Sequence, residues 1–147
     1  MTNRYEHQIN RYRHRFFEER MKDIDLNFPE GPYLIKIQEE KRVKMNHLKN
    51  SIPFHKSHLT RVINHLVEKG YILKEIDPED QRGFIVSITE EGENISKKAM
   101  SVVKEWDELL TSVITKEEMN MIDNIQRKMV HKIAEYFGED YIDEKNT

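Results

Sequence analysis

The sequence predicts a mainly α-helical protein with one small β-hairpin, and three observations lead to this fold class. Apolar residues recur every three or four positions through most of the chain, which is the period of an amphipathic helix. Pro53 and Phe54 separate two short segments of this kind, and such a pair is typical of a helix-turn-helix. After the second segment the period changes, because residues 71–76 and 83–89 are rich in the β-branched and aromatic residues that favour strands.

The N-terminal part predicts two helices joined by a loop. Residues 5–21 carry apolar side chains at spacings of three and four, with arginines around them. Two prolines within residues 27–32 indicate a loop at the entry of the next helix. We expect this second helix to cover residues 33–42, with Leu34, Ile37 and, at its end, Val43 facing inward.

The two short segments are central to the functional interpretation. Residues 45–52 predict a short helix, and residues 55–69 predict a second one that ends at Gly70. The second helix has an apolar face marked by Leu59, Ile63 and Leu66. Its other face carries hydrogen-bond donors or positive charge and no acidic side chain: Lys56, Ser57, His58, Thr60, Arg61, Asn64 and His65. Such a helix suits the major groove of DNA, but an ordinary solvated helix shows the same pattern, so the flanking segments must decide.

The flanking segments favour DNA binding. A polar loop, residues 77–82, joins the two predicted strands, and a β-hairpin directly after a helix-turn-helix is a wing. Residues 33–89 therefore predict a winged helix-turn-helix. Thr89 is expected to cap a long connecting helix over residues 90–114, and Thr115 and Glu118 form a capping box that opens a last helix ending at Gly138. The acidic tail, residues 139–147, is expected to fray.

Composition narrows the classes of function. The chain has no cysteine, which excludes disulfides and thiolate metal sites. Its seven histidines lack clustered carboxylates, so we expect no metal site. No Ser/His/Asp set, glycine-rich phosphate loop or His-Glu-x-x-His run occurs, so we expect neither an enzyme, with catalytic residues, nor a cofactor. Without an apolar run of about 18 residues or a signal-peptide core, we expect a soluble cytoplasmic protein that binds no membrane.

The net charge of −3 conceals an uneven distribution. Between residues 35 and 74, nine basic residues face three acidic ones, so this block carries +6 and the remainder of the chain −9. A basic middle places positive potential on one surface, while the acidic remainder keeps the protein in solution. The alternative is that the asymmetry arose by chance and has no function.

Three stretches around the predicted wing resemble a known family. Residues 66–72 read Leu-Val-Glu-Lys-Gly-Tyr-Ile, residues 77–83 read Asp-Pro-Glu-Asp-Gln-Arg-Gly, and residues 86–92 read Val-Ser-Ile-Thr-Glu-Glu-Gly. Together they resemble the wing signature of the MarR (multiple-antibiotic-resistance regulator) family of winged helix-turn-helix regulators. The length of the chain and the order of its predicted elements are similar to that family as well.

The resemblance implies a homodimeric, sequence-specific transcriptional regulator, usually a repressor, on a pseudo-palindromic operator in double-stranded DNA. Residues 1–147 would form one domain, with residues 1–28 and 115–138 as dimerisation helices. Arg82 matches the wing arginine that enters the minor groove, and Asp80 matches the acidic residue that orients arginine in the wing. The DNA contacts expected from the helix and the wing are Lys56, Ser57, His58, Thr60, Arg61 and Arg82.

Individual roles differ among these residues. Lys56 and Arg61 are expected to contact phosphates, and Ser57 and His58 are the better candidates for base edges. The sequence also departs from the family pattern, because Gln81 stands where an arginine is common and His55 takes the position of a stronger helix cap. The second departure leaves open the register of the helix, which Ser57 could cap instead.

Two further interpretations come with the resemblance. The family often binds small aromatic acids, which implies a small-molecule effector, and its candidate contacts here are Arg13, Phe17, Tyr33 and Trp106, although an aromatic stripe is more often plain core. The second hypothesis for the whole chain is a winged-helix module that binds another protein, such as an antirepressor, without strong DNA binding. The acidic remainder and the unusual turn motivate this alternative.

Overall fold

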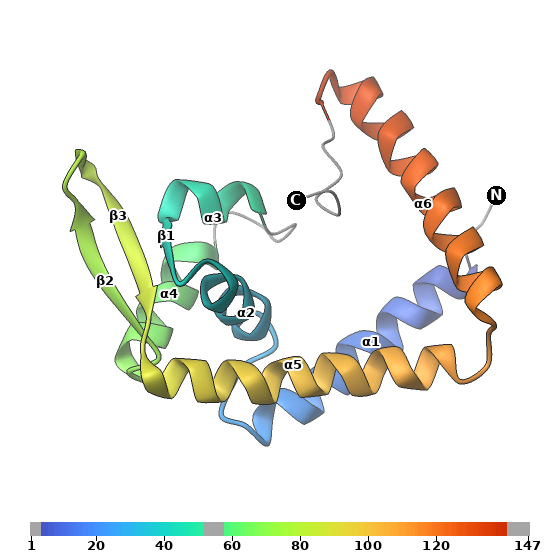
Figure 1. Ribbon diagram of the computed structural model, residues 1–147, viewed down its shortest axis with the longest axis horizontal. Coiled ribbons are helices and arrows are strands. Elements are labelled where there is room, and N and C mark those ends of the chain that lie inside the picture. The colour runs from blue at the N-terminus through green and yellow to red at the C-terminus, as the bar shows by residue number, and fades with distance from the viewer. Residues whose placement is uncertain (1–3, 52–57, 141–147) are drawn as a thin grey trace. The chain divides into compact units, whose positions relative to one another are not determined.

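The computed structural model describes residues 4–51 and 58–140, and it confirms the mainly helical fold class with a small antiparallel sheet. Two compact units divide the chain, the first ending at Trp106 and the second beginning at Asp107. The elements follow in the order α1 (Arg4–Lys22), α2 (Glu30–Glu40), β1 (Arg42–Lys44), α3 (Met45–Ser51), α4 (Leu59–Glu68), β2 (Ile72–Asp77), β3 (Asp80–Ile88), α5 (Glu90–Thr111) and α6 (Lys116–Phe137) (Figure 1). No helix among these elements is long and apolar enough to cross a membrane.

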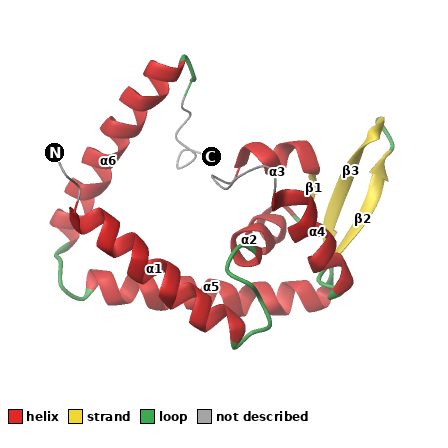
Figure 2. Ribbon diagram, turned by 180° about the vertical axis from the view of Figure 1, so that it is seen from behind, coloured by secondary structure: helices red, strands yellow, loops and turns green. Residues whose placement is uncertain are grey.

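The sheet of the first unit has one strand more than the sequence predicted. Its order is β1-β3-β2, with both pairings antiparallel, and the β2–β3 hairpin extends beyond β1 as the wing (Figure 2). The predicted helix over residues 33–42 is wrong at both ends, because α2 begins at Glu30 and ends at Glu40, before Lys41 with φ of +63°. Val43 is buried as predicted, but it pairs with Val86 in the sheet. A strand of three residues is too short to show a period of two.

The core of the first unit lies between the short helices and the sheet. Its members share almost complete burial and come from every element from α2 to β3: Leu34, Ile37, Val43, Leu48, Leu59, Ile63, Leu66, Ile72 and Val86. A core residue of this kind contributes roughly 1.5–3 kcal/mol by leaving water. The core therefore fixes α4 by its apolar face and leaves its polar face outward.

An aromatic cluster joins α1 to α5 within the same unit. The ring of Trp106 lies 5.4 Å from that of Phe16 and 6.0 Å from that of Phe17, measured between centroids. Arg20 adds an ion pair of 2.7 Å with Glu105. The predicted apolar stripe of the N-terminal helix thus packs partly on its own chain, whereas Tyr12 remains 54% exposed.

One junction connects α4, the wing and α5. Gly70 ends α4 with φ of +75°, which favours glycine, and the amide of Tyr71 bonds back to the carbonyl of Leu66 at 3.0 Å. The hydroxyl of Thr89 donates to the carbonyl of Gly70 at 2.7 Å and accepts from the amide of Gly92 at 3.1 Å. The predicted cap of the long helix is confirmed, and it also ties that helix to the end of α4.

The second unit contains the end of α5 and the whole of α6. The predicted capping box is present, since Thr115 accepts from the amide of Glu118 at 3.2 Å and Glu118 accepts from the amide of Thr115 at 2.7 Å. Gly138 ends α6 in the left-handed conformation, as predicted. The long helix α5 ends at Thr111, three residues before the predicted end.

We expect Gly92→Ala to destabilise the protein strongly. A Cβ at this position would lie 1.9 Å from the carbonyl oxygen of Tyr71, so the backbone of α5 or of the wing would have to move. The free energy of unfolding should fall by about 2 kcal/mol or more, as for other overpacked sites. Urea denaturation measures the change. Ser101→Ala, an exposed position of the same helix, should stay within about 0.5 kcal/mol of the parent protein.

Candidate nucleic-acid interface

The outward face of α4 is polar and accessible. His58, Thr60, Arg61 and Asn64 are exposed, and Arg61 lies with its Nη2 3.3 Å from Nδ1 of His58. Three of the predicted DNA contacts therefore lie together on one side of a helix whose other side is core. The predicted contacts Lys56 and Ser57, and the cap at His55, lie outside the described residues.

The tip of the wing is organised by Asp77, which is only 4% exposed. Its carboxylate accepts a hydrogen bond from the backbone amide of Glu79 at 2.9 Å. The ammonium of Lys44, in β1, lies 3.3 Å from the Asp77 carboxylate and 2.6 Å from the Glu79 carboxylate. The hydrogen bond from the Glu79 amide, followed by the Lys44 ammonium, lowers the pKa of Asp77. The hairpin connection is consequently tight, and β3 begins at Asp80 inside the predicted loop over residues 77–82.

Arg82 lies at the start of β3 and is exposed. Oδ1 of Asp80 accepts from the backbone amide of Arg82 at 3.0 Å, so Asp80 holds the backbone that carries the arginine. In the part of the chain that the structure describes, no carboxylate lies within 4 Å of the Arg82 guanidinium. Its full charge is therefore directed at solvent.

Lys74 links the wing to α4. Its ammonium donates to Oδ1 of Asn64 at 3.3 Å and lies 4.2 Å from the centroid of the Phe84 ring. The first contact connects β2 with the outward face of α4, and the second connects β2 with β3. Lys74 thus orients the hairpin relative to the helix, with a cation–π contact of roughly 0.5–1 kcal/mol at such exposure.

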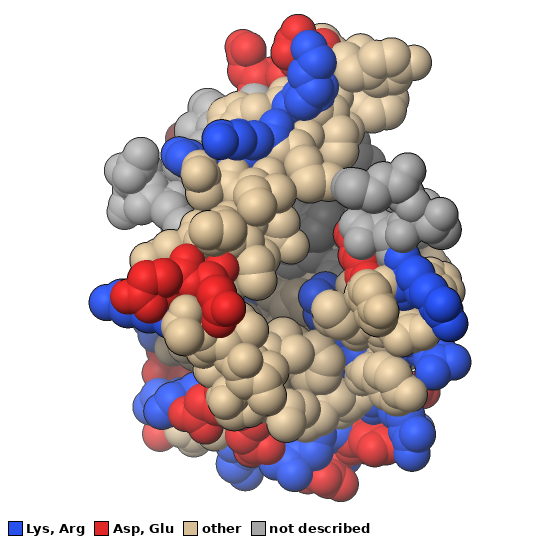
Figure 3. Space-filling view, turned by 90° about the vertical axis from the view of Figure 1, so that its right-hand side faces the viewer, with Lys and Arg blue, Asp and Glu red and all other residues tan. Residues whose placement is uncertain are grey.

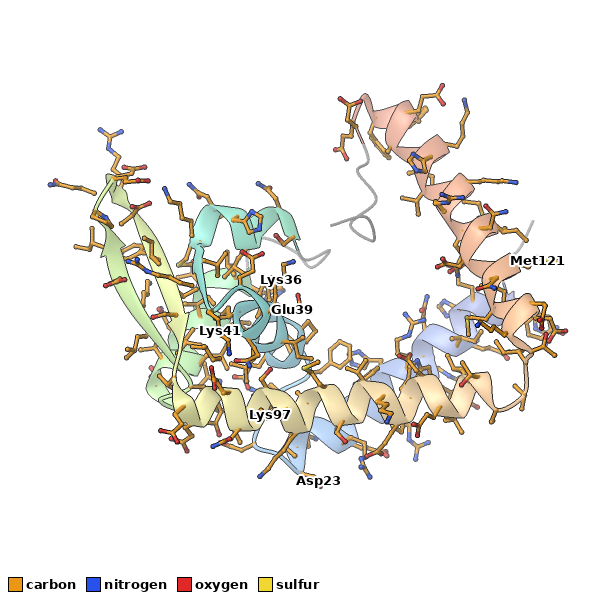
Figure 4. The ribbon with its side chains drawn as sticks, in the orientation of Figure 1. Asp23, Lys36, Glu39, Lys41, Lys97 and Met121 are labelled. Carbon is orange, nitrogen blue, oxygen red and sulfur yellow. The ribbon has the colours of Figure 1, made fainter. Side chains whose placement is uncertain are left out.

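Most cations of the basic block are paired inside the first unit. Lys41 contacts Glu93 at 2.5 Å, Arg42 contacts Glu75 at 2.6 Å, and Lys36 lies 3.5 Å from Glu40 and 3.8 Å from Glu39. Figure 4 labels Lys36 and Glu39 on α2 and Lys41 just after it. Figure 3 shows that acidic and basic side chains also lie near one another on a different face of the molecule. The sequence count of +6 therefore overstates the free positive charge. Among the described residues of the block, Lys49, Arg61 and Lys74 have no carboxylate partner within 4 Å.

The flank of α4 opposite the wing contacts the residues before and at the start of α2. Lys69, just after α4, donates to the carbonyl of Asp25 at 2.6 Å and to the buried carboxylate of Glu30 at 2.9 Å. The hydroxyl of Tyr71 donates to Asp25 at 2.9 Å, and burial together with this bond raises the pKa of Tyr71 to about 12. Polar contacts therefore hold α4 on both flanks.

The four ligand-binding candidates do not share one site. Arg13 and Phe17 line a small apolar cavity of about 160 Å³ together with Met21, Phe28, Pro32 and Ile35. Trp106 packs against Phe17, and Tyr33 is 1% exposed in the core, where burial raises its pKa. No group of three His, Cys, Asp or Glu residues suited to a metal ion occurs within residues 4–51 and 58–140.

Sequence reasoning missed Glu30, Lys44 and Asp77 as residues that build the interface. Asp77 precedes Pro78, and an aspartate that accepts from an amide two residues later is a known turn signal that could have identified it. Glu30 has no such signal, because its partners lie 35 and 39 residues away in the sequence.

The Asp77 contacts predict a pH dependence of stability. A lowered pKa in the folded state means that Asp77 stabilises the protein above its unfolded pKa of about 4, and that this contribution is lost as the pH falls through the lower folded value. The difference in unfolding free energy between the parent protein and Asp77→Asn should be present at pH 7 and shrink at acid pH. Denaturant titrations between pH 7 and pH 3 measure it, and a difference that grows at acid pH would contradict the assignment.

Comparisons with known proteins agree with this architecture. The family model described as transcriptional regulator SarA/Rot matches residues 15–99. The HTH-type transcriptional regulator BilQ of Clostridioides difficile is 32% identical over 75 residues, which is 51% of each chain, so this chain spans about half of that relative. The multiple antibiotic resistance protein MarR of Escherichia coli is 24% identical over 125 residues, covering 84% of this chain and 87% of MarR.

A solved structure shows the same fold. The crystal structure of a mutant MarR from Escherichia coli in complex with operator DNA superposes with a TM-score of 0.76 at 24% identity, covering 86% of this chain and 91% of the other. The resemblance read from the wing is thereby confirmed, and so is the expectation that the chain is not an enzyme. The chain belongs to the SarA/Rot family of transcriptional regulators, which have the MarR-like winged-helix fold.

Proposed function

We propose that this protein is a cytoplasmic, homodimeric repressor that binds a pseudo-palindromic operator. The observation that carries the proposal is that, among the described residues, Arg61 on α4 and Arg82 on the wing have no carboxylate within 4 Å. Other cations of the same winged region, Lys36, Lys41, Arg42, Lys44 and Lys69, form ion pairs instead. The operator complex of the related MarR supports the same use of the fold. Transcriptional regulation itself follows from the family.

DNA recognition divides between two elements. The polar face of α4 lies in the major groove, where His58 and Thr60 contact base edges and Arg61 contacts a phosphate. The wing follows the backbone, and Arg82 enters the minor groove, where a guanidinium senses groove width and negative potential. Lys74 helps to orient the wing relative to α4, because its ammonium donates a hydrogen bond to Asn64 and lies over the ring of Phe84.

The second unit supports dimerisation. The apolar side chains along α6 are exposed in the isolated chain, and Figure 4 labels Met121 among them. They are Met121 at 63%, Ile122 at 42%, Ile125 at 50%, Met129 at 42%, Ile133 at 56% and Phe137 at 68% exposed. Monomeric proteins rarely expose a contiguous apolar stripe of this length, and a second copy of α6 would cover it. Two winged units would then meet the two halves of the operator.

A small aromatic molecule is the effector that the cavity beside α1 suits best. The cavity beside α1 is lined by Phe17, which supplies an aromatic wall, and by the apolar part of Arg13, so its lining suits an apolar aromatic ring. Its volume of about 160 Å³ is below the range of drug-sized sites, so only a compact ligand enters. Occupation would push α1 from α2, through Phe28 and Pro32, and so disturb the start of the winged region.

One observation favours a second candidate function. The ion pairs of Lys41, Arg42 and Lys44 reduce the positive potential that non-specific DNA binding requires. A winged-helix module that binds another protein, such as an antirepressor, needs no such potential. Retained dimerisation without binding to any duplex at low salt would favour this alternative.

The DNA geometry is tested with Arg82→Ala and Arg61→Ala on a duplex from the region around the gene. Each change should weaken binding about tenfold or more, and Arg61→Ala should lower the slope of log K against log salt by about one unit. Arg42→Ala is the matched control, because it removes the same charge from a side chain already paired with Glu75. Fluorescence anisotropy across salt concentrations measures all three. Equal effects of the three changes would contradict the proposed contacts.

The dimer is tested on α6 with Ile125→Asp and Asn120→Asp. The two positions are five residues apart in the sequence, so on a helix of 3.6 residues per turn their side chains lie on nearly opposite sides. Ile125→Asp places a charge in the apolar stripe and should shift the protein to monomers, whereas Asn120→Asp should leave the dimer intact. Analytical ultracentrifugation at micromolar concentration distinguishes them, and an unchanged mass for Ile125→Asp would argue against α6 as the interface.

A further inference from the structure

We propose that His65 of α4 is a base-contacting residue and that the buried carboxylate of Glu30 determines which nitrogen of its ring faces the DNA. The inference rests on the proposed DNA-binding function. It adds His65 as a residue that determines base specificity, and Glu30 of α2 as a residue that positions His65.

Glu30 is an unusual acidic residue, since it is 1% exposed at the start of α2. Its Oε2 accepts from the amide of Asn27 at 2.7 Å and from the ammonium of Lys69 at 2.9 Å. Its Oε1 contacts Nδ1 of His65. Both oxygens are therefore occupied, by one donor from the loop before α2 and by two donors from α4 and its C-terminal end.

The contact with Glu30 sets the tautomer of His65. A carboxylate only accepts hydrogen bonds, so Nδ1 of His65 must carry the hydrogen that lies between the two groups. In a neutral imidazole, Nε2 then has a lone pair and acts as an acceptor. A carboxylate that fixes the tautomer and orientation of a histidine by its inner nitrogen is also how proteins prepare histidine ligands for metals.

The outer edge of His65 is available for a ligand. The side chain is 42% exposed although its partner Glu30 is 2% exposed, so the ring spans from the interior to the surface. His65 stands one helical turn after Arg61, and both line an open groove of about 790 Å³ between α4 and the residues around the start of α2. No partner for Nε2 exists among the described residues.

The chemistry of Nε2 selects its partner in the major groove. An acceptor pairs with the exocyclic amino group of adenine or cytosine, which are the donors that bases offer there. Guanine and thymine offer acceptors at the corresponding positions and would leave Nε2 without a bond. His65 therefore favours adenine or cytosine at one position of each half-site.

Helix anchoring alone does not account for His65. Lys69 already holds the end of α4 through Glu30 and through the carbonyl of Asp25 at 2.6 Å. The apolar face of α4 is buried by Leu59, Ile63 and Leu66. The half-exposed ring is thus free to serve recognition while its inner nitrogen is held.

The test measures affinity for the operator duplex with His65→Ala, Glu30→Gln and the matched control Glu40→Gln. Glu40 lies on the same helix as Glu30, and its carboxylate contacts His47 at 3.0 Å. Glu40→Gln therefore also removes one negative charge next to a histidine, but that histidine is not part of α4. His65→Ala and Glu30→Gln should each weaken binding about tenfold, and His65→Ala should lose the preference for adenine or cytosine at one position. Glu40→Gln should stay within about twofold or bind slightly tighter, since it removes a negative charge.

A double-mutant cycle tests whether Glu30 acts through His65. In the His65→Ala background, Glu30→Gln should cause no further loss of affinity. Additive losses would assign Glu30 to helix packing and overturn its positioning role. Long-range proton–nitrogen NMR of the free protein provides a second readout, because His65 should show hydrogen on Nδ1 and lose this preference in Glu30→Gln. Hydrogen on Nε2 in the parent protein would overturn the inference without any DNA.

The outcomes separate this inference from the proposed function. If Arg82→Ala weakens binding and His65→Ala does not, only the role of His65 fails. If the parent protein binds no duplex, both fail. Thermal denaturation checks each variant, and if Glu30→Gln does not fold, His65→Ala with its base preference still decides the outcome.

Discussion

The close approach of Gly92 to the carbonyl group of Tyr71 is the constraint on which the arrangement of α4, the wing and α5 depends. At this point the first turn of α5 lies directly against the chain that leaves α4 and enters the wing. Thr89 completes the junction, since its amide bonds the Tyr71 carbonyl at 3.1 Å and its hydroxyl bonds Gly70. The end of α4, the entry of the wing and the first turn of α5 are therefore packed against one another at a single junction.

The distribution of free positive charge in this protein depends more on which cations form ion pairs than on how many cations the chain contains. A chain with net charge −3 binds DNA only if its few free cations stand where the phosphates and grooves are. The ion pairs of Lys41, Arg42 and Lys44 hold these cations on the sheet and at the wing tip. Among the described residues of the block and the wing, Lys49, Arg61, Lys74 and Arg82 remain without a carboxylate within 4 Å. An exposed ion pair stabilises little, about 0–1 kcal/mol, so its main effect here is on the distribution of positive potential.

Two polar flanks hold α4 in different ways. Toward the wing, the contact is an exposed hydrogen bond of 3.3 Å from Lys74 to Asn64. Toward α2, the buried carboxylate of Glu30 permits little movement, because separating it from Lys69 and His65 would leave a charge without partners in the interior. The helix is thus held by a buried charge on the side of α2 and by an exposed hydrogen bond on the side of the wing, and His65 lies on the first of these flanks.

The sequence by itself determined the elements whose signals are local. The apolar period placed the helices, Thr89 and the Thr115–Glu118 box placed two helix starts, and Gly70 and Gly138 placed two ends, because caps act within one turn. The tertiary structure alone decided what depends on distant partners. Strand β1 exists because Val43 pairs with Val86. Three cations of the +6 block pair with Glu75, Asp77 and Glu93, and Glu30 contacts residues 35 and 39 positions away. Burial and pairing over such separations follow from packing, which no local pattern encodes.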